Sequence, residues 1–215
     1  MNSKNPLKVA VLLSGNGSNL QAIIDYSQTP NCAYEVALVI SNRPNAYGLT
    51  RAKEAGIATQ IIDHTRYESR EEFDQSMQKI LDLQQIQLVV LAGFMRILTA
   101  EFTEHFIGRM INIHPSLLPK YQCLNTHQRA IDAGDDEHGL SIHFVTPELD
   151  GGPVIAQSKT AIMENDNAET LQNRIHTLEH LAYPQVVDWI AQERLSLSNN
   201  EIIFDGGSIT TPIVL

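Results

Sequence analysis

The stretch Leu7-Lys8-Val9-Ala10-Val11-Leu12-Leu13-Ser14-Gly15-Asn16-Gly17-Ser18 carries the strongest signal for the fold. Its apolar first part is typical of a β-strand that is buried on both faces. A turn of small residues follows at once, and Leu20, Ile23 and Ile24 then recur at helical spacing. This order of strand, short loop and helix is the repeating unit of α/β proteins.

The same alternation continues along the chain. Further strands are expected at residues 34–41, 58–62, 88–92 and 110–114, and helices at 47–55, 69–83 and 100–106. Ser69 followed by Glu72 has the spacing of a capping box at a helix start. The pattern predicts an α/β fold: a single doubly wound, Rossmann-like domain whose mostly parallel sheet is covered by helices on both faces.

The pattern loosens after Pro115. A short helix is expected at 125–133, paired strands at 140–145 and 154–159, a long helix at 168–190, and a small hairpin near Asp205-Gly206-Gly207. The sequence has no repeat and no clear linker, so we expect one domain over residues 1–215 that includes a tail at 191–215.

Composition narrows the class of protein. The chain of 215 residues is 43% hydrophobic with a net charge of -10, which provides a core but disfavours nucleic-acid binding, because phosphate contacts need clustered Lys and Arg. Cys32 and Cys123 form no Cys-x-x-Cys pair, and residues 1–6 lack the apolar run of a signal peptide. No run approaches the roughly 20 apolar residues of a membrane helix. We therefore expect a cytoplasmic protein with reduced thiols.

The turn after the first strand is suited to an anion. Residues 14–19 place glycines and small polar side chains at a helix start, where free N–H groups and the helix dipole attract negative charge. A dinucleotide motif would need glycine where Leu20 stands, and a Walker loop would need a lysine that this turn lacks. The turn therefore suits a single phosphate group; the alternative is a tight turn that only caps the helix.

Asn112, His114 and Asp150 form the candidate catalytic set. Asn112 and His114 alternate on one expected strand, so both project from one face at the carboxyl end of the sheet, where open α/β folds bind ligands. If Asp150 meets His114 in space, its charge raises the pKa of the imidazole, and the imidazolium and Asn112 can both donate to an oxyanion. The alternatives are a structural histidine and an aspartate that only forms a turn.

The other histidines favour structural interpretations. His143 lies inside an apolar strand and is expected to be packed, whereas His127 and His138 are expected at the surface. His176 and His180 have the spacing of a zinc pair, but no His-Glu-x-x-His pattern surrounds them, so we expect no metal site.

Several longer motifs extend this set. They are residues 14–21 (Ser-Gly-Asn-Gly-Ser-Asn-Leu-Gln), 89–98 (Val-Val-Leu-Ala-Gly-Phe-Met-Arg-Ile-Leu), 112–119 (Asn-Ile-His-Pro-Ser-Leu-Leu-Pro), 143–145 (His-Phe-Val) and 148–155 (Glu-Leu-Asp-Gly-Gly-Pro-Val-Ile). Together they resemble the phosphoribosylglycinamide formyltransferases of purine biosynthesis, within the wider folate-dependent formyltransferase group. The likeness runs from about Lys8 to Trp189.

The resemblance implies direct transfer of a formyl group from the co-substrate 10-formyltetrahydrofolate to the glycine amine of 5-phosphoribosylglycinamide. Asn112 and His114 would stabilise the oxyanion, while Asp150 would keep His114 charged and help to order a water. The phosphoribosyl part would be held by Gly17, Ser18, Asn19, His176, Thr177, Leu178 and Glu179. Residues of about 7–106 would then form a phosphate-binding half, and residues of about 107–190 a folate-binding and catalytic half.

The folate would lie in an apolar cleft. The resemblance assigns to it Arg70, Met95, Arg96, Ile97, Leu98, Asn112, Thr146, Pro147, Glu148, Leu149 and Asp150. Arg70 and Arg96 could face the carboxylates of the glutamate tail. The implied partners are small molecules alone, with no metal, no nucleic acid and no membrane, and the implied state is a monomer or weak homodimer.

One position departs from the resemblance. Cys123 stands where the family usually has glycine, and Gln122 precedes it where Pro or Lys is common. If that glycine is needed for a positive φ, Cys123 implies a shifted loop beside the folate cleft, with an effect on folate affinity.

Other functions stay open from the sequence. A formyltetrahydrofolate hydrolase would use the same three residues with water as nucleophile, but usually carries an additional N-terminal domain. A methionyl-tRNA formyltransferase would need an RNA-binding domain and a basic surface, which the net charge of -10 disfavours. A non-catalytic phosphate-binding regulator would keep residues 14–19 without needing the catalytic set, and Leu20 argues against a nicotinamide dehydrogenase.

Overall fold

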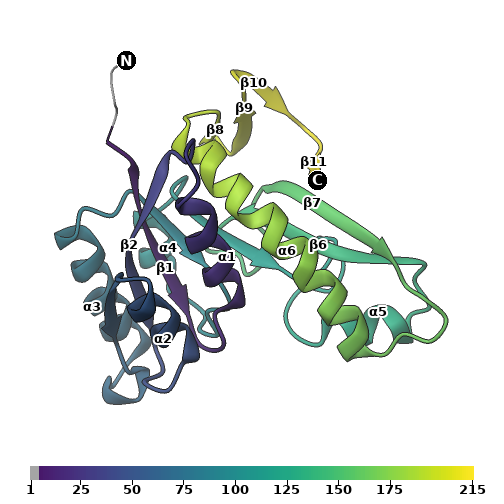
Figure 1. Ribbon diagram of the computed structural model, residues 1–215, viewed down its shortest axis with the longest axis horizontal. Coiled ribbons are helices and arrows are strands. Elements are labelled where there is room, and N and C mark those ends of the chain that lie inside the picture. Colours follow the sequence, from purple (N-terminus) through teal and green to yellow (C-terminus); the bar gives the residue numbers. More distant parts are fainter. Residues whose placement is uncertain (1–4) are drawn as a thin grey trace.

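The computed structural model describes residues 5–215 (Figure 1). In chain order the elements are β1 (Leu7–Leu13), α1 (Ser18–Ser27), β2 (Tyr34–Ser41), α2 (Tyr47–Glu54), β3 (Ala58–Ile61), the 3-10 turn η1 (His64–Arg66), α3 (Arg70–Leu83), β4 (Leu88–Leu91), α4 (Ala100–His105), β5 (Met110–His114), α5 (Thr126–Asp132), β6 (Glu137–Phe144), β7 (Val154–Ala161), α6 (Ala168–Ala191), β8 (Leu195–Ser198), β9 (Glu201–Phe204), β10 (Gly207–Ile209) and β11 (Ile213–Val214). The sequence of residues 1–6 has no signal-peptide pattern, and residues 1–4 of this segment lie outside the described residues.

One eight-stranded sheet organises the molecule, in the order β11-β7-β6-β5-β4-β1-β2-β3. Strands β3, β2, β1, β4 and β5 run parallel, whereas β6 lies antiparallel between β5 and β7. This confirms the predicted α/β fold with a mostly parallel sheet. The chain moves outward from β1 to β3 and returns to β4 on the other side of β1. Ligands of open α/β sheets bind at the carboxyl ends of strands beside such a reversal.

Helices cover both faces of the sheet and enclose two hydrophobic cores. Along β1, the side chains of Val9, Val11 and Leu13 pack in the core under α1, α2 and α6. Ala10 and Leu12 pack in the core under α3 and α4. Burial on both faces explains why β1 is an unbroken apolar run in the sequence.

The start of α3 contains half of the expected capping box. Ser69 Oγ accepts from the backbone N–H of Glu72 over 3.1 Å, as predicted. The Glu72 carboxylate, however, accepts from the N–H of Glu68 and not from that of Ser69. Ser69 still caps the helix, because one such bond satisfies a free N–H of the first turn.

The carboxyl-terminal part differs from the expectation in two places. β6 begins at Glu137 instead of residue 140, because residues 137–139 pair with β7. The expected hairpin is present as β9 and β10, but β8 extends it to three strands and β11 joins the main sheet beside β7. β8 and β11 are too short to show a periodic pattern in the sequence. No helix within residues 5–215 combines the length and apolar character needed to cross a membrane.

Candidate active site

β5 brings Asn112 and His114 to the carboxyl edge of the sheet. The strand ends at His114, and the two residues share one face because they lie two positions apart. In the antiparallel pairing with β6, Asn112 lies opposite His143, and His114 lies opposite Ser141. The neighbours of both candidate side chains are therefore set by the register between β5 and β6.

The ring of His114 is held from two sides. Its Nε2 lies 2.9 Å from the carbonyl oxygen of Tyr121, and its Nδ1 lies 3.6 Å from Asp150 Oδ2. Since a carbonyl oxygen only accepts, Nε2 carries a hydrogen, and Nδ1 is the atom that can gain or lose a proton beside the carboxylate. The side chains of His114 and Asp150 are only 7% and 9% exposed, so water screens their charges weakly.

Asp150 is held by the loop that precedes α5. Its Oδ2 accepts from the backbone N–H of Cys123 over 3.1 Å, and its carbonyl oxygen accepts from Gln122 Nε2 over 3.4 Å. Its other carboxylate oxygen, Oδ1, lies 3.9 Å from His143 Nε2. The carboxylate thus lies between two histidines and the loop.

This loop has an unusual backbone. Tyr121, Cys123 and Asn125 have φ values of 55, 68 and 59, in the left-handed region that favours glycine. The positive φ at Cys123 is therefore the conformation for which the glycine that the family usually has at this position would be suited. Cys123 adopts this conformation at a cost of about 1 kcal/mol relative to glycine, and its N–H still reaches Asp150.

His143 orients Asn112, a role that the sequence interpretation missed. His143 Nδ1 lies 2.9 Å from the carbonyl oxygen of Phe144, so Nδ1 carries the hydrogen and Nε2 is the acceptor. Asn112 Nδ2 donates to that Nε2 over 3.2 Å, which leaves the second N–H of the amide for another acceptor. Burial lowers the pKa of His143 and favours the neutral ring that this bond needs. His143 is packed, as expected. It lies beside Asn112 because the register between β5 and β6 pairs the two residues.

The loop after β1 contacts α6. Gly17, with φ 76, caps α1, which begins at Ser18. Asn19 Nδ2 donates to Glu179 Oε2 over 2.7 Å, and Asn19 Oδ1 is buried without a hydrogen-bond partner among residues 5–215. Burial is the main cause that raises the pKa of Glu179. The structure therefore brings together two of the predicted substrate-binding residues, Asn19 and Glu179, and leaves a buried acceptor beside them.

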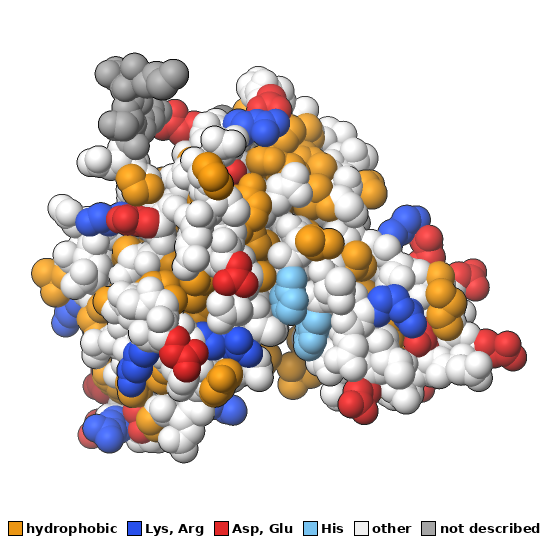
Figure 2. Space-filling view, in the orientation of Figure 1, with side chains coloured by type: hydrophobic (Ala, Val, Ile, Leu, Met, Phe, Trp, Pro, Cys, Tyr) orange, Lys and Arg blue, Asp and Glu red, His pale blue; other side chains and the backbone are white. Residues whose placement is uncertain are grey.

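Three further predicted residues of α6 differ in their surroundings. The ring of His176 stacks on that of His180, with centroids 6.2 Å apart. Leu178 packs against the hydrophobic core, and the exposed Thr177 donates to the carbonyl oxygen of Asn173. Figure 2 shows two histidine side chains side by side at the surface of this face of the molecule. Within the described part of the chain, no group of three or more His, Cys, Asp or Glu side chains could hold a metal ion.

The expectation that His127 and His138 lie at the surface is wrong for His138. His138 lies in β6, is 1% exposed, and has its Nε2 3.1 Å from Nδ1 of the half-buried His127. Burial is the main reason why the pKa of His127 falls to about 4, and burial also lowers the pKa of His138. The cause of the error is the early start of β6, which turns an expected loop residue into a strand residue.

Apolar side chains are exposed around the predicted folate cleft. Met95, Ile97 and Leu149, which follow β4 and β6, are 59%, 56% and 47% exposed. Arg96 lies between Met95 and Ile97, and its Nε is buried without a partner in the described residues. An apolar surface beside an unpaired guanidinium N–H fits a flat ring system that carries carboxylates.

The other residues that the resemblance assigns to folate binding are Leu98, residues 146–148 and Arg70. Leu98 packs against the core under α3 and α4. Residues 146–148 lie in the loop between β6 and β7, just before Leu149, Asp150 and two glycines. Arg70 is exposed at the first position of α3.

Comparison with known proteins shows the family. The model of the family described as formyl transferase matches residues 7–187. The chain belongs to the formyl transferase family. Within that family it is 48% identical over 200 residues to phosphoribosylglycinamide formyltransferase of Escherichia coli (strain K12), over 93% of this chain and 94% of that protein. It is 40% identical to the trifunctional purine biosynthetic protein adenosine-3 of Homo sapiens, over 92% of this chain and 20% of that protein.

Solved structures of this formyl transferase family agree with the fold. Phosphoribosylglycinamide formyltransferase from Coxiella burnetii, solved in complex with CHES, has a TM-score of 0.93 and 51% identity, over 98% of this chain and 99% of that chain. Glycinamide ribonucleotide transformylase 1 from Symbiobacterium toebii has a TM-score of 0.90 and 37% identity, over 94% and 95% of the two chains. The chain is therefore an enzyme that groups with the phosphoribosylglycinamide formyltransferases.

Proposed function

We propose that the protein transfers the formyl group of 10-formyltetrahydrofolate to the glycine amine of 5-phosphoribosylglycinamide, in de novo purine (IMP) biosynthesis. The observation that carries this proposal is that Asn112 and His114 share one face of β5 at the carboxyl edge of the sheet, with Asp150 Oδ2 3.6 Å from His114 Nδ1. The set combines a neutral donor, a titratable ring and a buried carboxylate, which is the chemistry that formyl transfer through an oxyanion needs. Membership of the formyl transferase family supports the choice of reaction.

The catalytic set has two tasks in this reaction. As the amine nitrogen bonds to the formyl carbon, the formyl oxygen gains negative charge, and the second N–H of Asn112 and protonated Nδ1 of His114 donate to it. The Asp150 carboxylate, 3.6 Å from Nδ1, stabilises the positive charge on the ring. The bond from the formyl carbon to the folate nitrogen then breaks. The proton that the amine loses passes to that nitrogen, through a water beside Asp150.

Substrate binding is assigned to the surroundings of this set. Backbone N–H groups of Gly17, Ser18 and Asn19 hold the substrate phosphate at the start of α1, since a helix N-terminus attracts anions. Glu179 accepts from the ribose hydroxyls or holds the amine. The folate ring lies between residues 95–98 and 146–150, which include the exposed Met95, Ile97 and Leu149, and Arg96 pairs with a carboxylate of the folate tail. We expect this chemistry in the cytoplasm, in a monomer or weak homodimer.

A single assay tests the proposal. The absorbance change on conversion of 10-formyltetrahydrofolate is followed with and without 5-phosphoribosylglycinamide. Release of the deformylated folate that depends on the ribonucleotide is the expected result. Release at the same rate without the ribonucleotide would indicate a hydrolase, and no release under either condition would contradict the proposed reaction.

A further inference from the structure

α2 holds the loop after β1 through the side chain of Arg51. Its Nε donates to the carbonyl oxygen of Asn16 over 3.0 Å, and its Nη2 donates to Asn16 Oδ1 over 3.1 Å. Because both acceptors belong to one residue, the planar guanidinium fixes the backbone and the side chain of Asn16 together. Asn16 lies between Gly15 and Gly17, and glycine has more backbone conformational freedom than any other residue. Contacts that hold Asn16 therefore restrict the most flexible part of the loop.

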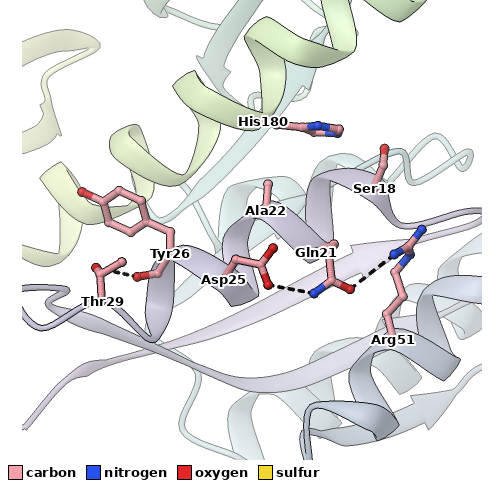
Figure 3. Close-up of a pocket in the computed structure, with 8 residues that line it drawn as sticks. All are labelled: Ser18, Gln21, Ala22, Asp25, Tyr26, Thr29, Arg51 and His180. Carbon is pink, nitrogen blue, oxygen red and sulfur yellow. Dashed lines mark hydrogen bonds between the residues drawn. The ribbon is translucent and has the colours of Figure 1, made fainter.

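Arg51 is itself held in place. Its Cζ lies 4.9 Å from the centroid of the Tyr47 ring, and its Nη1 donates to Gln21 Oε1 over 3.3 Å. Gln21 in turn donates to Asp25 over 2.9 Å. Figure 3 shows this chain of side chains along α1, with the guanidinium beside the end of the helix that carries Ser18. Arg51, Gln21 and Asp25 line an open cavity of about 550 Å³, together with Ser18.

A second contact joins the same two elements. The backbone N–H of Gly48 donates to the carbonyl oxygen of Gly15 over 3.1 Å. A Cβ built on Gly17 would lie 2.7 Å from the Cα of Gly48, so the loop and the first turn of α2 pack backbone against backbone. α2 therefore contacts the loop at each residue from Gly15 to Gly17.

We propose that Arg51 is a positioning residue for the substrate phosphate. The proposal rests on the proposed function, in which the loop after β1 binds that phosphate. Backbone N–H groups bind an anion more tightly when they already converge on the binding position in the free protein, because the loop then loses less conformational entropy on binding. Arg51 supplies this order through Asn16, and its positive charge lies on the same side of α1 as Ser18. Arg51 thus sets the preference for a phosphorylated substrate and leaves the formyl transfer step unchanged.

The test compares 5-phosphoribosylglycinamide with the same substrate lacking its phosphate. In Arg51→Gln we expect the KM for the phosphorylated substrate to rise by about tenfold or more, since two charge-assisted hydrogen bonds are lost. The kcat should stay within about twofold, and kcat/KM for the unphosphorylated substrate should not change, because the loop takes no part in the chemical step. Ribose 5-phosphate, which has no reacting amine, should inhibit this variant more weakly by a similar factor.

Two further variants separate geometry from charge. Arg51→Lys keeps the charge but cannot donate to both atoms of Asn16 in one plane, so its KM should also rise. Lys53→Gln removes the same charge from an exposed position of α2 and should leave both substrates unaffected. A normal KM in Arg51→Gln, full recovery in Arg51→Lys, or an equal effect in Lys53→Gln would each overturn the proposal.

A failure of the proposed function would be recognised separately. In that case the unmodified protein would show no turnover that depends on the ribonucleotide, whereas failure of the Arg51 proposal leaves such turnover intact. If Arg51→Gln does not fold, Asn16→Ala replaces it, because that variant removes one of the two acceptors and leaves Arg51 in place. It should show a smaller rise in KM that is again confined to the phosphorylated substrate, and an unchanged KM would overturn the proposal.

Discussion

The Nε2–H of His114 donates to the carbonyl oxygen of Tyr121 over 2.9 Å. This bond decides which nitrogen of the ring can exchange a proton, because it commits Nε2 and leaves Nδ1 facing Asp150. The carbonyl belongs to a loop in which Tyr121 has a φ of 55, so the orientation of the ring depends on a strained backbone. The same loop holds Asp150 through the N–H of Cys123. One segment of chain therefore aligns both members of the pair.

Removal of either member of this pair should lower turnover more than substrate binding. In His114→Ala and Asp150→Asn we expect kcat to fall by about 100-fold, which corresponds to roughly 3 kcal/mol of lost transition-state stabilisation. The KM for the phosphoribosyl substrate should change by only a few fold, since its phosphate binds elsewhere. Steady-state kinetics check this, with Asp132→Asn at an exposed position as control. A normal kcat in either variant would rule out the assignment.

His143 should affect turnover through Asn112. In His143→Leu the amide of Asn112 loses the acceptor that orients it, so we expect kcat to fall by about tenfold, the effect of one misplaced donor. His143→Gln can offer an amide oxygen at a similar place and should recover part of the loss. Thermal melting of both variants separates this effect from unfolding. Equal loss of kcat in the two variants, at equal stability, would show that the acceptor does not matter.

Glycine at position 123 should stabilise the protein. Cys123 has a φ of 68, which costs a residue with a Cβ about 1 kcal/mol or more. Cys123→Gly should therefore raise the free energy of unfolding by about 0.5–1 kcal/mol, after the greater freedom of glycine in the unfolded chain is subtracted. Cys123→Ala keeps the Cβ and should give no such gain. Urea denaturation measures both variants, and the same stability in the two would contradict the explanation based on backbone strain.

Acid should destabilise the fold partly through His127. Burial first, and then the charge of His138, lower its pKa in the folded protein to about 4 from the ordinary 6.5. As the pH falls from 6.5 toward about 4, the unfolded chain takes up a proton that the folded protein does not, so the free energy of unfolding decreases. Above this range the residue makes no pH-dependent contribution.

Denaturation at several pH values across that range checks this prediction. His127→Gln should reduce the slope of stability against pH, because the substituted side chain does not titrate. A slope that is unaffected in His127→Gln would show that another group controls the acid sensitivity.

Local patterns predicted the first half of the fold well. The strand, loop and helix from Leu7 to Ser27 follow from an apolar run and a helical face, which are both visible within a short window. His138 was placed wrongly because the first residues of β6 have no apolar alternation and form a strand only by pairing with β7. Because such pairing depends on a separate segment of the chain, it cannot be recognised from the pattern of residues within a short stretch of sequence.

In the candidate site, too, the sequence suggested individual residues but did not reveal the contacts that depend on strand pairing or loop conformation. Asn112 and His114 were proposed from the sequence because they alternate on one expected strand, and Asp150 was proposed because of its chemistry and the family resemblance. The bond between Asn112 and His143 depends on the register of two strands, which the sequence does not reveal. The positive φ at Tyr121 was equally hidden, because tyrosine does not signal a left-handed conformation. At Cys123 only the glycine that the family usually has there pointed to a positive φ.

The close approach of Gly17 and Gly48 limits how this protein can evolve. A Cβ on Gly17 would press on the backbone of α2, and a Cβ on Gly48 would overlap the side chain of Leu13. At Gly17 the obstacle is main chain, which no rotamer change nearby can move aside. At Gly48 the obstacle is the end of the fully buried Leu13 side chain, which can move only by displacing its neighbours in the core. We therefore expect sequences that evolve from this one to retain both Gly17 and Gly48, whereas exposed positions of α2 such as Lys53 should accept many substitutions.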